Sequence, residues 1–240
     1  MAQEATAASK VRAMVRAALH FAGAIFAALA AGEARAAGSE LSGTIELIPP
    51  AGRPAGPAGT VVWLPDVRVS AAPAAAPEVA SQGKRFEPRV LVVTRGTTVA
   101  FPNADRVYHN AFSLSPGNTF DLGLYHRGTS RSATFEAPGV VRVYCNIHPD
   151  MAAFVVVIEG DAYAIVGSDG AYRIAGVPPG RHAVKLWNEM TGEQTASYDF
   201  VAGKAVRWDV TLDASRYRPP VHKNKHGRPY PPATQDDDRY

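Results

Sequence analysis

The sequence predicts an all-β protein built from antiparallel β-sandwiches, and two observations support this fold class. Short runs rich in Val, Ile, Thr and aromatic residues recur between residues 41 and 212, and Gly- and Pro-containing turns separate them. Many short strands punctuated in this way are typical of sandwiches. No segment after residue 37 keeps a helical period over the roughly 11 residues that such an assignment needs.

The composition is that of an ordinary globular protein with a core. The 240 residues are 46% hydrophobic and 20% charged, which leaves room for one large or two small domains. The formal net charge is only +3, and no Lys/Arg-rich run occurs. The sequence therefore does not indicate nucleic acid as a partner.

The N-terminus has the layout of a secretory signal peptide. Three basic residues precede an almost purely apolar run over residues 17–31, and Ala34-Arg35-Ala36 has the form of a cleavage site. This run is shorter than the ~18–20 residues that span a bilayer, so a retained anchor is the lesser alternative. We expect residues 1–36 to be removed, the mature chain to be periplasmic, and no stable membrane insertion to remain.

The mature chain opens with two strand signals separated by a Pro/Gly-rich loop. Residues 42–48 alternate between polar and apolar side chains, and residues 59–65 form a compact apolar run. An Ala/Pro-rich connector follows over residues 71–76.

A block of closely spaced strands then occupies residues 79–158. Its strand signals lie at residues 90–93, 98–101, 109–114, 120–125, 133–135, 140–144 and 154–158. Turns such as Ala137-Pro138-Gly139 separate them. The spacing predicts one sandwich domain in this block.

A second, smaller block occupies residues 159–213. Its strand signals lie at residues 162–166, 170–174, 182–187 and 205–212, with a hairpin turn at Ser168-Asp169-Gly170. The rest of the chain is rich in Arg, Lys, Pro and Tyr and has almost no aliphatic residues. We expect residues 214–240 to be a disordered tail, because they cannot bury enough apolar surface to fold alone.

The residues with distinctive chemistry are the single cysteine and those that follow it. Cys145 is followed by His148 and Met151, and His109 lies upstream as a candidate second imidazole. A thiolate, imidazoles and a thioether are ligands that copper prefers. The alternatives for Cys145 are a buried small residue at a strand end, a free thiol or an intermolecular disulfide partner.

Residues 79–158 resemble the cupredoxins, closest to the plastocyanin and amicyanin type that includes methylamine-utilisation proteins. The matching stretches are Phe86-x-Pro88, Gly96-Thr97-Thr98-Val99-x-Phe101-x-Asn103, His109-Asn110 and Cys145-Asn146-Ile147-His148-Pro149-Asp150-Met151. The resemblance implies a Greek-key β-sandwich that holds one type 1 copper ion.

The same resemblance implies a role for each matching polar residue. The implied near-trigonal copper ligands are His109, Cys145 and His148, and the implied long axial ligand is Met151. Asn103 matches an asparagine that hydrogen-bonds the ligand loop, and Asn110 is a further candidate for contact with the ligands. Four protein ligands leave no open position for a substrate, so we expect electron transfer and no enzymatic activity.

Residues 169–180 resemble the carboxypeptidase regulatory-like, transthyretin-like β-sandwich. The matching stretches are Asp169-Gly170-x-Tyr172-x-Ile174 and Val177-Pro178-Pro179-Gly180. The block 159–213 is short for that module, so residues 40–66 are candidates for its missing opening strands. The cupredoxin-like block would then be inserted into a split accessory sandwich; the alternative makes residues 42–65 extra cupredoxin strands.

These expectations together describe a periplasmic blue-copper electron carrier. By family analogy, electrons leave through His148, beside Pro149, Ala152 and Ala153, to a transient redox protein. One alternative is a copper-binding or copper-delivery protein without a redox partner. Another is an exported adhesion or carbohydrate-associated module. We interpret His126 as a turn residue.

Overall fold

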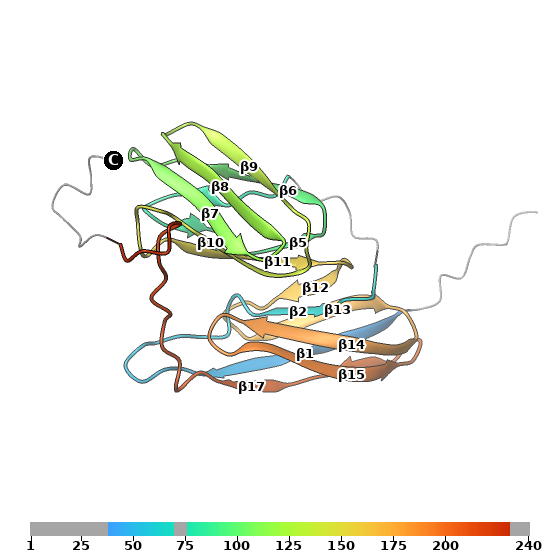
Figure 1. Cartoon of the computed structure of the whole chain (residues 1–240). Helices are drawn as coiled ribbons and strands as arrows, with labels where there is room; N and C mark the ends of the chain where they lie inside the picture. The colour runs from blue at the N-terminus through green and yellow to red at the C-terminus, as the bar shows by residue number, and fades with distance from the viewer. Residues whose placement is uncertain (1–37, 70–75, 231–240) are drawn as a thin grey trace, which may run out of the picture. The chain divides into compact units, whose positions relative to one another are not determined.

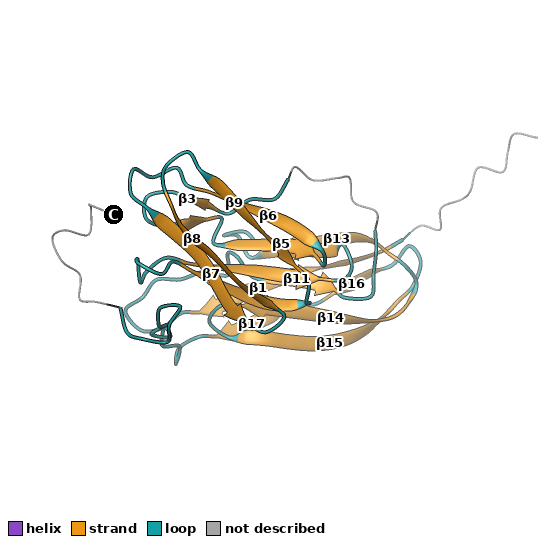
Figure 2. Ribbon diagram, turned by 45° about the horizontal axis from the view of Figure 1, so that its top comes forward, coloured by secondary structure: helices purple, strands orange, loops and turns teal. Residues whose placement is uncertain are grey.

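The computed structural model describes residues 38–69 and 76–230, which form strands and loops and no helix (Figures 1 and 2). The all-β prediction is confirmed. None of the described residues belongs to a helix that could cross a membrane. The predicted signal peptide, residues 1–36, lies outside the described residues.

The strands are β1 (Ser39–Ile48), β2 (Val61–Leu64), β3 (Ala80–Ser81), β4 (Phe86–Glu87), β5 (Val90–Thr94), β6 (Thr97–Pro102), β7 (His109–Ser115), β8 (Asn118–Tyr125), β9 (Ser130–Phe135), β10 (Gly139–Tyr144), β11 (Ala152–Ile158), β12 (Ala162–Ile165), β13 (Ala171–Val177), β14 (Gly180–Asn188), β15 (Gly192–Phe200), β16 (Ala205–Arg207) and β17 (Val210–Asp213).

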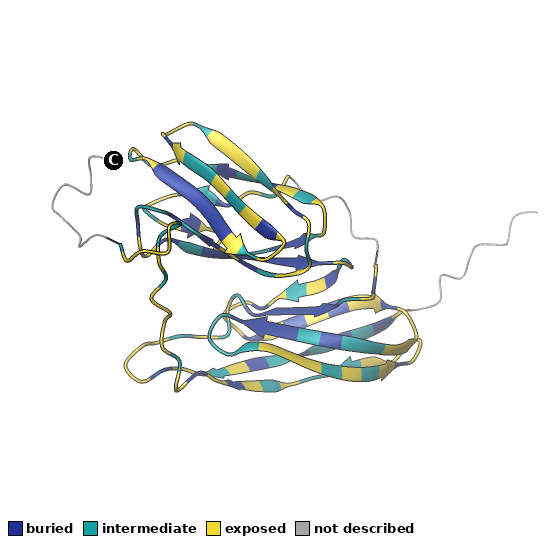
Figure 3. Cartoon of the chain, in the orientation of Figure 1, coloured by how far each residue is buried: buried dark blue, intermediate teal, exposed yellow. Residues whose placement is uncertain are grey.

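The middle of the chain folds into a sandwich. One layer is a five-stranded sheet of order β5-β11-β10-β7-β8, and β6 pairs with β9 across from it. The ring centroid of Phe120, in the larger sheet, is 5.8 Å from the ring centroid of Phe101 in β6 and 5.8 Å from that of Phe135 in β9. Strands β7 and β11 are buried along most of their length (Figure 3). The core therefore lies directly below the strand ends that carry the candidate ligands.

The first and last strands build a second sandwich. One sheet contains β13, β1 and β16, with β17 also paired to β1, and the other has the order β12-β2-β14-β15. Leu41, Gly43 and Ile45 of β1 are buried, and Ser42 and Thr44 between them are less so, because alternate side chains of a strand point to opposite faces. Leu41 and Ile45 pack in one core with Leu186 and Leu212.

Strand β2 is buried at every residue because its two faces contact two different clusters. Leu64 packs in the core of the second sandwich. Trp63 faces the other way, into a cluster that includes Phe154 of β11 and Trp187 of β14, whose ring centroids are 5.1 Å apart. A strand covered on both faces has a continuous apolar sequence, which explains the compact run seen at residues 59–65.

The opening strands pair with strands of the second block. Strand β2 pairs with β12 and β14, and β1 pairs with β13, β16 and β17. Among the described residues, no pairing joins β1 or β2 to any strand from β3 to β11. The pairing is thus the one that the split-sandwich hypothesis requires, and β1 and β2 pair only with strands of the second block in the described part of the chain.

Two strand assignments in the second block differ from the expectation. Strand β15 was not expected, because most of its residues are polar and exposed at the edge of the sheet. The strand expected over residues 205–212 is divided at Trp208 and Asp209. There the Trp208 N–H donates to the Ser42 carbonyl, and the Asp209 carboxylate accepts from the Thr44 N–H at 2.8 Å. The side-chain bond replaces a ladder bond and so interrupts the strand.

The C-terminal segment also differs from the expectation of a disordered tail. Residues 214–230 follow a defined course, with Lys225 and Tyr230 bonded to residues of the first sandwich. These contacts are hydrogen bonds and ring stacking. A prediction based on the lack of aliphatic residues therefore missed them. Residues 231–240 lie outside the described part of the chain.

Candidate metal centre

The loop between β10 and β11 carries three of the four predicted ligands and is closed by its own backbone. The Cys145 N–H donates to the Met151 carbonyl, and the Met151 N–H donates to the His148 carbonyl, both at 3.2 Å. Cys145 and Met151 are fully buried, and His148 is 9% exposed. This ligand loop, residues 145–151, therefore holds its side chains in one compact turn at the end of the sandwich.

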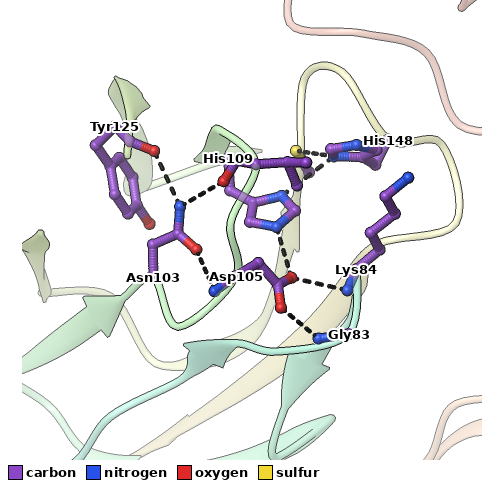
Figure 4. Close-up of polar contacts among 9 residues, drawn as sticks. Gly83, Lys84, Asn103, Asp105, His109, Tyr125 and His148 are labelled. Carbon is purple, nitrogen blue, oxygen red and sulfur yellow. Dashed lines mark hydrogen bonds and ion pairs between the residues drawn. The ribbon is translucent and has the colours of Figure 1, made fainter. Parts of the chain in front are cut away.

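His109 reaches the same place from the start of β7. Its Nδ1 lies 3.1 Å from Nδ1 of His148, which in turn lies 3.6 Å from Sγ of Cys145 (Figure 4). One donor atom from each of the three residues lies within 4.8 Å of the others, and all three residues are buried. The structure thus brings together two imidazoles and one thiol from segments far apart in the sequence.

Two of the three donor separations fit a single bound ion, and the third, between His109 and Cys145, is within 4.8 Å. A metal binds histidine nitrogen at about 2.0–2.1 Å and cysteine sulfur at about 2.3 Å. Two donors of one ion can therefore be no more than about 4.2–4.4 Å apart. The nitrogen–nitrogen distance of 3.1 Å and the sulfur–nitrogen distance of 3.6 Å satisfy that limit. The mixture of one sulfur and two imidazole nitrogens is the donor set that suits copper.

Met151, the predicted axial ligand, is fully buried in the same core cluster as Cys145. Its backbone is hydrogen-bonded to the backbones of Cys145 and His148. Met151 remains the predicted fourth ligand, placed in the same loop and excluded from water.

Asp105 is a site residue that the sequence reasoning missed. Its Oδ2 lies 2.7 Å from Nε2 of His109. The same carboxylate accepts the backbone N–H groups of Gly83 and Lys84, at 2.7 and 2.8 Å (Figure 4). Gly83 and Lys84 both have positive φ in the turn between β3 and β4, an arrangement that aims successive N–H groups at one anion. An acidic residue four positions before a ligand histidine was the available signal.

The Asp105 carboxylate determines how the His109 ring presents its nitrogens. Burial acts to raise the pKa of Asp105, but the Lys84 and Gly83 N–H groups and His109 together hold it below its ordinary value. The ionised carboxylate accepts the proton on Nε2, which leaves Nδ1 with a lone pair directed at Cys145 and His148. A carboxylate that fixes the tautomer of a ligand histidine in this way is a common feature of metal sites.

Asn103 has a different set of contacts from the one that the resemblance implies. Its amide nitrogen donates to the carbonyls of Val107 and Tyr125, both at 3.0 Å, and its oxygen accepts from the Asp105 N–H at 2.9 Å. These bonds shape the segment before His109 and tie it to β8 (Figure 4). Asn103 therefore orders the His109 side of the site, and its side chain makes none of these bonds to the ligand loop.

Asn110 contacts the thiol through its backbone. Its N–H, with those of Ile147 and His148, stabilises the ionised sulfur of Cys145, but burial dominates and raises the pKa of this thiol. The Asn110 side chain instead donates to Asp121 at 2.7 Å and so fastens β7 to β8. Burial also lowers the pKa of His109. Burial thus favours the protonated thiol, and a bound metal would displace that proton.

An open hollow of about 610 Å³ lies beside His148. It is lined by Lys84, Arg85, Phe86, Glu87, Arg89, His148, Pro149, Asp150 and Ala152. Ala153, which we expected at an apolar exit surface, is fully buried. The accessible surface next to His148 is therefore mixed in charge rather than a small apolar patch. His126 is outside the site, in an exposed turn, and contacts the Arg127 carbonyl at 2.8 Å.

No protein-family model and no curated protein matches the chain. Solved structures similar to it include a Cu(I) form of an amicyanin variant, at 22% identity over 40% of this chain and 97% of the amicyanin, with a TM-score of 0.33. An oxidised amicyanin variant gives the same values. A purple cupredoxin from Nitrosopumilus maritimus is 26% identical over 34% of this chain and 98% of its own, with a TM-score of 0.30.

Proposed function

We propose that this protein is a periplasmic, cupredoxin-like type 1 copper protein that carries single electrons between redox partners. The observation that supports the proposal most strongly is the meeting of one thiol and two imidazoles in a buried site, with donor separations of 3.1 and 3.6 Å. Thiolate and imidazole are ligands that copper accepts in both of its common oxidation states.

In this proposal His109, Cys145 and His148 would hold one copper ion, with Met151 as a weaker fourth ligand. When bound, copper would supply one-electron chemistry by alternating between Cu(I) and Cu(II). The protein's own contribution is a site ordered in advance. The Asp105 carboxylate fixes the His109 ring, and backbone bonds close the ligand loop. Burial of the thiol keeps water and oxidants away from it.

Four protein ligands would leave no coordination position for a substrate, which supports a carrier rather than an enzyme. We place the approach of a transient redox protein at the hollow beside His148, because His148 is the partly accessible member of the three buried donors. Export to the periplasm rests on the signal-peptide pattern of residues 1–36. The second sandwich, with its carboxypeptidase regulatory-like motif, would serve as an accessory domain.

Absorption and EPR spectra of the copper-loaded protein test this function. Wild-type protein should show the intense visible absorption of a Cu(II)–thiolate bond and should be reduced reversibly by one electron per copper. Cys145→Ala should remove that absorption. His126→Ala, which changes an exposed histidine outside the site, should leave it intact.

The alternatives give different results in the same experiment. A protein that binds Cu(I) tightly but never shows the thiolate absorption is a copper-delivery protein. A protein that binds no copper is an exported β-sandwich module, and the electron-carrier proposal is then wrong.

A further inference from the structure

The segment after β17 crosses the first sandwich and contacts the ligand loop from outside. In Figure 1 the described end of the chain, drawn in red, lies beside β10. Its residues stack on the ring of Tyr144 and hydrogen-bond to the Cys145 carbonyl, the Asn146 side chain and the Pro149 carbonyl. No expectation from the sequence assigned this segment a role at the site.

We infer that residues 222–230 form a strap that holds the ligand loop closed, with Tyr230 and His222 as positioning residues for the loop that carries Cys145 and His148. The part of this inference that concerns copper rests on the proposed function. The part that concerns access to the Cys145 thiol does not.

Tyr230 makes the most direct contact. Its hydroxyl donates to the carbonyl oxygen of Cys145 at 2.8 Å. That carbonyl belongs to the residue that supplies the only thiol, at the point where β10 ends and the ligand loop begins. The bond therefore restrains the backbone on which the sulfur is carried.

His222 contacts the residue before the ligand loop and one residue within it. Its ring stacks on Tyr144, with centroids 4.0 Å apart and planes inclined by 18°. Its Nε2 is hydrogen-bonded to the Pro149 carbonyl, and its Nδ1 lies 3.2 Å from the Tyr230 hydroxyl. One side chain thus bridges the residue before Cys145, the residue after His148 and the second strap residue.

The strap has a turn of its own, which keeps these contacts in register. The Asn224 side chain accepts the N–H groups of His226 and Arg228, at 3.0 and 3.1 Å, and Gly227 has a positive φ of 72°. Lys225 projects from this turn. Its N–H donates to Asn146 at 3.0 Å, and its ammonium group contacts Asp121 of β8 at 2.6 Å.

These contacts oppose any opening of the ligand loop. Cys145 is fully buried, so a reagent can reach its sulfur, and copper can leave, only when the loop opens locally. Each lost hydrogen bond should increase the open population by about two- to tenfold. The strap should therefore set the rate of both processes without changing which residues bind the metal.

The alkylation rate of Cys145 in the metal-free full chain tests the strap directly, with iodoacetamide as the probe. Tyr230→Phe and His222→Phe keep an aromatic ring and lose the bonds to Cys145 and Pro149, so each should react about two- to tenfold faster than wild type. Tyr217→Phe is the matched control, because its hydroxyl is in the same segment but faces Glu189 at 3.5 Å. It should react at the wild-type rate.

Thermal unfolding of the same variants separates positioning from a general loss of stability. An increase in alkylation with an unchanged unfolding temperature supports the strap. Wild-type alkylation rates in both Tyr230→Phe and His222→Phe would overturn it. An increase that appears equally in Tyr217→Phe, or that only follows a fall in unfolding temperature, would also overturn it. Lys225→Met, which removes the contact with Asp121 and keeps the backbone bond to Asn146, should also react faster than wild type.

Copper-loaded protein then extends the test. Release of Cu(I) to bathocuproine disulfonate should be faster in Tyr230→Phe and His222→Phe than in wild type and Tyr217→Phe. If the protein binds no copper, the proposed function fails while the alkylation rates still decide the strap. If copper binds and is released at equal rates in all variants, the strap has no role at the metal centre and the proposed function stands.

Discussion

At the scale of single residues, Asp105 connects two parts of the site that lie apart in the sequence. One carboxylate joins the β3–β4 turn to His109 through three donors at 2.7 to 2.8 Å. The shared anion holds the imidazole in one orientation before any metal arrives. Because the histidine side chain is already ordered in the folded chain, metal binding would lose less conformational entropy.

Replacement of Asp105 should weaken copper binding while leaving the ligands in place. We expect Asp105→Asn to lower the affinity for copper by about 10- to 100-fold, the range found when outer partners of ligand histidines are removed. Competition with a chelator of known affinity measures the change. Asp150→Asn, an exposed acid within the ligand loop, should bind copper as wild type does. Equal affinity in Asp105→Asn and wild type would contradict the role assigned to this carboxylate.

Asp121 provides a second charged contact, between β8 and the strap. Burial acts to raise its pKa, but Lys225, the Gly123 N–H and the Asn110 side chain together hold the pKa below its ordinary value. The ionised form therefore stabilises the folded chain above the unfolded pKa of about 3.9, and this contribution is lost as pH falls through the lower folded pKa.

The acid dependence of unfolding measures that contribution. In urea denaturation of metal-free protein, wild type should be more stable than Asp121→Asn by a constant margin above about pH 5, and the margin should shrink in stronger acid. A margin for Asp121→Asn that does not change between neutral and strongly acidic pH would show that Asp121 does not contribute through its charge.

At the scale of elements, β1 organises the second sandwich because three later strands pair with it. It meets β13 along one edge and both β16 and β17 along the other. The last two strands are separated where the chain passes close to Gly43. A Cβ atom at Gly43 would lie 2.0 Å from the Trp208 carbonyl oxygen, so only glycine allows this approach.

Gly43→Ala should therefore destabilise the protein. The added methyl group meets backbone atoms that cannot rotate away, and overpacking of this kind typically costs about 1–3 kcal/mol. Chemical denaturation gives the free energy of unfolding. Gly56→Ala is the matched control, because a Cβ there has no atom within 4 Å. Similar stabilities for the two variants would mean that β1 and the 208–209 segment separate easily.

At the scale of the described molecule, the two sandwiches share a buried cluster built from β2, β5, β11 and β14. Phe154 follows the ligand loop closely in sequence, and it packs against Trp187 of the second sandwich. Arg89 adds two hydrogen bonds to Glu189, at 2.8 and 2.6 Å, and one to the Ala152 carbonyl at 3.0 Å. The strand that follows the ligand loop is thus supported by residues of the other sandwich.

Trp187→Ala should lower the free energy of unfolding by about 3–5 kcal/mol, since it empties a large buried volume. The loss should be visible in the first sandwich as well, as an earlier exposure of Cys145 to a thiol reagent in rising denaturant. Val201→Ala changes a residue that is 50% exposed and should stay within about 0.5 kcal/mol of wild type. Unchanged exposure of Cys145 in Trp187→Ala would show that the shared cluster does not stabilise the first sandwich.

The local part of the metal centre could be predicted from the sequence. Cys145, His148 and Met151 fall in one short loop between two strand signals, so their proximity follows from chain geometry alone. The all-β class was equally accessible, because strand and turn patterns are local. His109 was a candidate as an upstream imidazole, and the family resemblance implied its role as a ligand; the structure places its Nδ1 beside His148.

Only the tertiary structure decided the contacts between distant segments. The bond from Asp105 to the β3–β4 turn, the pairing of β2 with β12 and β14, and the docking of Tyr230 on Cys145 join residues that no local pattern connects. Each depends on polar groups that could find partners in many places, or on sheet edges that could accept several strands. The choice among them is made by burial and hydrogen bonding in the whole folded chain.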